Sequence, residues 1–81
     1  MTHYLPINCN FYDELEAYAT LRQPVTIVFQ DPAAAEPQTV RTRILDFYIR
    51  DKVEFMVVEK EPAIRLDWLL LVDGKIPPPV C

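Results

Sequence analysis

The spacing of apolar residues changes at Pro24, and this change constrains the fold more than any other feature of the sequence. Before Pro24 the apolar residues recur at helical intervals, whereas after it they alternate, as is typical of β-strands. We therefore expect one helix, from about Phe11 to Arg22, followed only by strands. Because the chain has 81 residues and a hydrophobic content of 51%, it can form one domain around one small core.

The expected helix is amphipathic and carries acidic residues near its start. Asn8 or Asn10 can cap it, and with Asn10 as the cap Asp13 stands at the third helical position. Glu14 and Glu16 then also lie near the positive end of the helix dipole. The apolar face comprises Phe11, Tyr12, Leu15, Tyr18 and Ala19, and the opposite face Asp13, Glu16 and Thr20.

Four alternating segments predict four strands. They run from Val25 to Phe29, from about Thr39 to Ile49, from Val53 to Val58 and from Ile64 to Val72. In the last of them, one face is expected to hold Ile64, Leu66, Trp68, Leu70 and Val72.

In the second strand the apolar residues stand at even-numbered positions up to Ile44 and at odd-numbered positions after it. Such a change of side indicates a bulge or a strong bend. The expected fold class is therefore α+β, with an N-terminal helix packed on a small, strongly bent antiparallel β-barrel. Residues 1–73 are expected to form a single domain, and residues 74–81 a flexible proline-rich tail.

The net charge of −4 lies entirely in the N-terminal half of the chain. Residues 1–40 hold five acidic side chains against Arg22 alone, whereas the remaining residues hold seven of each sign. This asymmetry favours a basic partner. Since we see no clustered basic face in the sequence, no direct nucleic-acid ligand is expected. No secretory segment and no long apolar run is present, so we expect a cytoplasmic protein with no membrane role.

The sequence predicts neither an enzyme nor a metal or cofactor site. There is no serine, and the one histidine, His3, stands six residues from Cys9 with no further ligands at standard spacing. Arg65 and Asp67 are expected on the same face of the last strand, pairing with charges on a neighbouring strand. Trp68 is expected in the core, because its parity matches that of its apolar neighbours.

The acidic helix has two interpretations. Acidic residues near the start of a helix are ordinarily a solvated face, favoured by the helix dipole. However, Tyr4 and Tyr12 flank the acids, and tyrosine beside charge is common where proteins bind one another. From the residues alone, a solvated face and a binding surface both stay open.

Several short motifs occur in one order along nearly the whole chain. They are Tyr4-x-Pro6-Ile7-Asn8-Cys9, Tyr12-Asp13-x-Leu15-Glu16, Arg50-x-x-Val53-Glu54, Val57-Val58-Glu59 and Arg65-Leu66-Asp67. In these motifs the chain resembles the bacterial Rho-binding antiterminator family (Rof, also called YaeO). It departs from the family pattern at Phe11, where an acid is expected, and in its longer loop from Pro32 to Pro37.

The resemblance implies an Sm-like fold and a non-enzymatic inhibitor of Rho-dependent transcription termination. Such an inhibitor binds the termination factor Rho near the basic RNA-binding sites of its N-terminal domains. We expect the chain to act as a monomer, and an Sm-like RNA-binding module that assembles into a ring is the alternative. The expected partner-binding residues are Tyr4, Asn8, Asn10, Tyr12, Asp13, Glu14 and Glu16.

Overall fold

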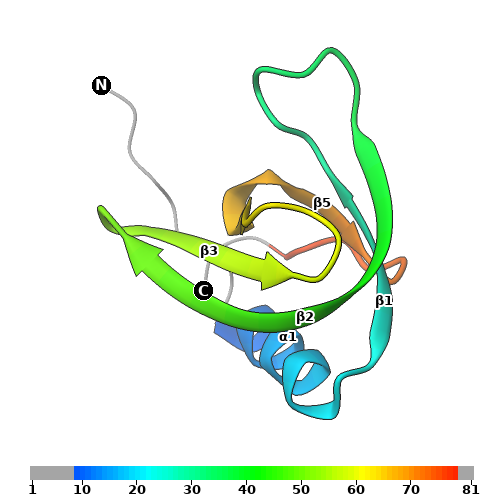
Figure 1. The fold of residues 1–81 in the computed structure, drawn as a ribbon, viewed down its shortest axis with the longest axis vertical. Helices are drawn as coiled ribbons and strands as arrows, with labels where there is room; N and C mark the ends of the chain where they lie inside the picture. Colours follow the sequence, from blue (N-terminus) through cyan, green and yellow to red (C-terminus); the bar gives the residue numbers. More distant parts are fainter. Residues whose placement is uncertain (1–8, 79–81) are drawn as a thin grey trace.

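The computed structural model of this chain describes residues 9–78, so Tyr4 and Asn8 lie outside the described part. The fold is α+β: one N-terminal helix lies against a bent antiparallel sheet, as Figure 1 shows. The helix is α1 (Cys9–Leu21), and a short 3-10 turn, η1 (Leu66–Trp68), interrupts the last part of the chain. The strands are β1 (Pro24–Phe29), β2 (Gln38–Arg50), β3 (Val53–Val58), β4 (Ile64–Arg65) and β5 (Leu69–Val72).

The sheet has the order β4-β3-β2-β1-β5, and all of its pairings are antiparallel. The predicted barrel is therefore wrong in one respect: the sheet is not closed. Strands β4 and β5 form its two edges, and they do not pair with each other within residues 9–78. The chain leaves β4 after two residues to enter η1, which leaves too little strand to close the sheet.

Strand β2 is the central strand of the sheet, and it contains the predicted change in which residues face inward. Its first half pairs with β1 and its second half with β3, and the register shifts between Ile44 and Asp46. Thr42 and Ile44 are buried before the shift, whereas Phe47, of the opposite parity, packs against the core after it. The bulge thus lets one long strand turn its inner face around the core, and β2 curves accordingly in Figure 1.

Two tight turns explain how consecutive segments meet. Asp51 and Lys52, between β2 and β3, have φ of 52° and 65°, and Asp73 and Gly74 have φ of 52° and 82°. Positive φ at both central residues is the pattern of a two-residue hairpin turn. Residues 74–78 of the predicted tail are described, and Lys75 exchanges two backbone hydrogen bonds of 2.9 Å with Val72.

The predicted strand from Ile64 to Val72 is wrong, because η1 divides it. One helical turn of three residues changes which side chains face inward. Leu66 and Leu69 are buried, whereas Leu70 is 43% exposed and Trp68 packs against the core only in part.

Arg65 also differs from expectation, since it pairs with Asp67 of its own segment. Its Nε and Nη2 donate to the two carboxylate oxygens of Asp67 at 2.9 and 2.8 Å. The turn brings these two side chains together.

The core lies between α1 and the inner face of the sheet. Phe11 and Leu15 come from α1 and pack with Val25 and Ile27 of β1 and Met56 of β3, all of them buried. The predicted apolar face of the helix is thereby confirmed. Among the described residues, no helix is both long and apolar enough to cross a membrane.

Candidate partner-binding surface

The acidic residues of α1 lie further along the helix than the sequence predicts. The helix begins at Cys9, so the interpretation of Asn10 as its cap is wrong, and no acid stands in the first turn. Asp13 is the fifth helical residue, and the dipole effect falls off within the first turn. Little of the helix stability therefore depends on these carboxylates. Asn10, Asp13, Glu14 and Glu16 are all exposed.

Glu14 and Glu16 project from different sides of the helix. Successive residues of an α-helix are about 100° apart, so positions two apart diverge by about 160°. Lys75 Nζ donates to Glu14 Oε1 at 3.0 Å, which neutralises Glu14 locally. Glu16, four residues after Tyr12, therefore lies on the same side of α1 as Tyr12, whereas Glu14 faces the turn after β5. Asp13 lies between these two sides, about 100° from Tyr12.

Tyr12 lies where α1 meets the sheet, among carboxylates from three elements. Its ring packs on Phe47 of β2, with a centroid distance of 5.1 Å and an interplanar angle of 42°. Burial raises the pKa of Tyr12, and the negative charges of Glu16, Glu54 and Asp46 raise this pKa further. These carboxylates come from α1, β3 and β2 respectively.

We call this region the acid–aromatic surface. It consists of Tyr12, Glu16, Asp46, Phe47 and Glu54. Sequence reasoning missed Asp46, Phe47 and Glu54 as site residues. The signal for the first two was their position directly after the predicted parity change in β2, and Glu54 belongs to one of the recognised motifs.

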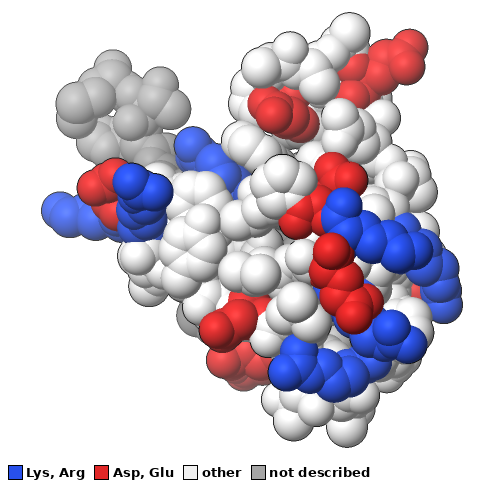
Figure 2. Space-filling model, in the orientation of Figure 1, with Lys and Arg blue, Asp and Glu red and all other residues white. Residues whose placement is uncertain are grey.

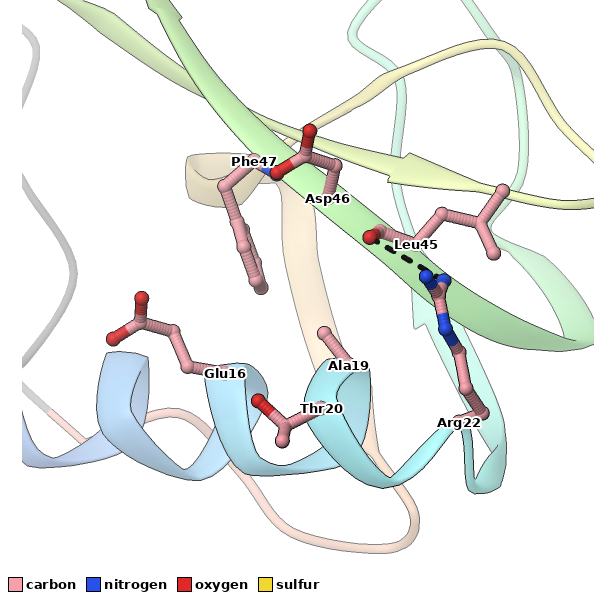
Figure 3. A pocket seen from close by; sticks show the side chains of 7 residues that line it. All are labelled: Glu16, Ala19, Thr20, Arg22, Leu45, Asp46 and Phe47. Atoms are coloured by element: carbon pink, nitrogen blue, oxygen red, sulfur yellow. Dashed lines mark hydrogen bonds between the residues drawn. The ribbon is translucent and has the colours of Figure 1, made fainter.

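A groove of about 270 Å³ runs between α1 and β2 beside this surface (Figure 3). The ring of Phe47 points from β2 toward the helix, and the small side chain of Ala19 stands below it. Glu16 lies near one end of the groove. At the other end Arg22 Nη1 donates to the carbonyl oxygen of Leu45 at 3.5 Å. The groove is thus negative at one end and positive at the other.

Three carboxylates on α1 and β2 are accessible to a partner. Asp13, Glu16 and Asp46 form no ion pair with any residue between positions 10 and 78. All three are exposed. Within the same part of the chain, no three His, Cys, Asp or Glu side chains are grouped so that they could hold a metal ion. The chemistry that this surface offers is therefore charge and aromatic contact.

Comparison of the chain with protein-family models, with curated proteins and with solved structures finds no match.

Proposed function

We propose that this protein inhibits Rho-dependent transcription termination. It binds the basic RNA-binding region of Rho through the acid–aromatic surface and so blocks the engagement of RNA. The observation that carries the proposal is the position of Tyr12, packed on Phe47 beside Glu16 and Asp46. The choice of Rho as the partner rests on the motifs in which the chain resembles the Rho-binding antiterminator family.

The surface has the composition of a protein interface. Buried aromatic side chains at the centre and charged groups at the rim are the usual arrangement of binding hot spots. Exposed carboxylates complement a surface that binds phosphates, and they increase the rate of encounter with it. Glu16 and Asp46 therefore act by attraction, while Tyr12 and Phe47 provide the apolar contact.

The fold is compatible with the Sm-like part of the proposal. The N-terminal helix and the strongly bent five-stranded antiparallel sheet match the coarser part of what the resemblance implies, although the sheet is not closed into a barrel. The bulge in β2 supplies a bend without any glycine in the sheet, since the one glycine, Gly74, lies in the turn after β5.

An in vitro termination assay with purified Rho tests the function directly. We expect the protein to increase the fraction of transcripts that read through a Rho-dependent terminator. Unchanged readthrough at saturating protein would contradict the proposal, whichever surface is involved.

The contact surface is tested by Glu16→Lys. Reversal of this charge should slow association with Rho about tenfold and flatten its salt dependence, because steering by an exposed charge acts chiefly on the association rate. Glu36→Lys in the loop between β1 and β2 is the matched control, with the same charge change outside the surface. If both variants bind Rho alike, the acid–aromatic surface is not the contact.

A ring-forming RNA-binding module is the second candidate, and it would require the edge strands β4 and β5 to pair between copies. Strand edges of this kind can pair between copies. Tight binding of a short single-stranded RNA by an oligomer would favour this function over Rho inhibition.

A further inference from the structure

A second concentration of charge, opposite in sign to the net charge, lies away from the acid–aromatic surface. Arg41 and Arg43 of β2 and Lys60, in the turn after β3, line a pocket of about 220 Å³. Its remaining lining residues are Pro24, Thr42 and Glu59. Lysine and arginine side chains gather on the side of the molecule where β1, β2 and this turn meet, with carboxylates between them (Figure 2).

Both guanidinium groups are held in place by the fold. Arg41 Nη1 donates to Thr26 Oγ1 at 2.9 Å, and Arg43 Nε donates to the carbonyl oxygen of Arg22 at 3.1 Å. A guanidinium has five N–H donors, so each group keeps donors for a ligand. Because these side chains are already ordered, binding loses less conformational entropy than it would with free side chains.

The walls of the pocket are joined by hydrogen bonds as well. The backbone N–H of Glu59 donates to the carbonyl oxygen of Arg43 at 3.2 Å. The next N–H, of Lys60, donates to Oγ1 of Thr42 at 3.3 Å, and Thr42 is 3% exposed. The turn that carries Lys60 is therefore fixed to the strand that carries the two arginines.

The pocket carries a net charge of about +2, since one carboxylate accompanies three cations. That carboxylate, Glu59 Oε1, lies 3.4 Å from Arg43 Nη1, and both side chains are well exposed, at 39% and 47%. An exposed pair of this kind contributes little and gives way readily to a more highly charged anion. Guanidinium groups match the oxygens of phosphate in particular, because they can donate two parallel hydrogen bonds.

We propose that this pocket binds a phosphate-bearing anion through Arg41, Arg43 and Lys60. No aromatic side chain lines it, so a nucleobase has nothing to stack on and the ligand is recognised by its phosphate groups. The phosphate groups come either from a free polyphosphate anion or from the backbone of single-stranded RNA. The site is independent of the acid–aromatic surface and does not depend on the binding of Rho.

The test is to titrate the full chain with each of two probes, inorganic tripolyphosphate and a short single-stranded RNA. Isothermal calorimetry measures the affinity for each probe. The variant Arg41→Gln/Lys60→Gln should weaken binding about tenfold, because two charge-assisted contacts are lost. It retains Arg43, whose contact with Arg22, the residue after α1, is structural, and circular dichroism checks that the variant folds. For the RNA probe, the slope of log affinity against log salt should fall by about 0.7 for each cation removed.

The matched control is Arg50→Gln/Lys52→Gln, which makes the same charge change at the tip of the β2–β3 hairpin. Retained binding in this control, together with loss in the pocket variant, supports the site, and the probe that binds identifies the source of the phosphate groups. The proposal is overturned if neither probe binds, or if the pocket and control variants weaken binding equally.

Discussion

At Tyr12, burial and the charges of Glu16, Glu54 and Asp46 all raise the pKa of one phenol. A raised pKa means that the folded state holds its proton at a pH where the unfolded chain has lost it. This contribution to stability is complete below the ordinary tyrosine pKa of about 10, and it is lost as the pH rises through the folded value. Removal of one charge by Glu16→Gln should lower the pKa of Tyr12, as followed by tyrosinate absorbance.

The control at this scale is Glu36→Gln, which removes a carboxylate from the loop between β1 and β2 and should leave the tyrosinate titration unchanged. If Glu16→Gln also leaves the titration unchanged, Glu16 does not act on Tyr12, and the acid–aromatic surface would lose one of its members.

At the scale of elements, α1 is attached to the sheet by its buried face, and Leu15 is fully buried there. Leu15→Ala should lower the free energy of unfolding by about 2–5 kcal/mol, because a cavity is left in a close-packed core. Leu21→Ala makes the same substitution at the end of the same helix, where the side chain is 69% exposed, and should cost less than about 0.5 kcal/mol. Urea denaturation of both variants measures the difference. Equal losses would mean that α1 does not pack as described.

At the scale of the whole molecule, the edges of the open sheet decide whether copies associate. Strand β4 has two residues, and at Val72 the edge of β5 exchanges hydrogen bonds with Lys75. Short or covered edges discourage pairing between chains. We expect light scattering to give the mass of a monomer across a wide range of protein concentration. A mass several times larger would instead support the ring-forming alternative.

Most of the fold was predictable because the spacing of apolar residues and the residue types that form turns are local properties of the sequence. The helix and the strands β1, β2 and β3 match the prediction to within a few residues, and the bulge of β2 is visible as a change of parity near Ile44. The break at Leu66 was not predictable by alternation, since an uninterrupted apolar run gives the same pattern for a strand and for a strand broken by a turn.

The candidate site was predictable only in part. The sequence nominates Tyr12, Asp13 and Glu16 because they are neighbours along one helix. Asp46 and Glu54 stand more than 29 positions further on, and no local pattern relates them to that helix. They influence Tyr12 because β2 and β3 pair beneath α1, which is a property of the sheet.

By itself, the sequence determined the helix and the strands β1, β2 and β3, and it placed the excess of acidic residues in the N-terminal half. The tertiary structure alone decided which charges meet: it pairs Glu14 with Lys75, it leaves Glu16 beside Tyr12, and it gathers three cations around another pocket. The physical reason is that backbone preference acts over a few neighbouring residues, whereas electrostatic and packing contacts depend on distances that exist only after the chain has folded.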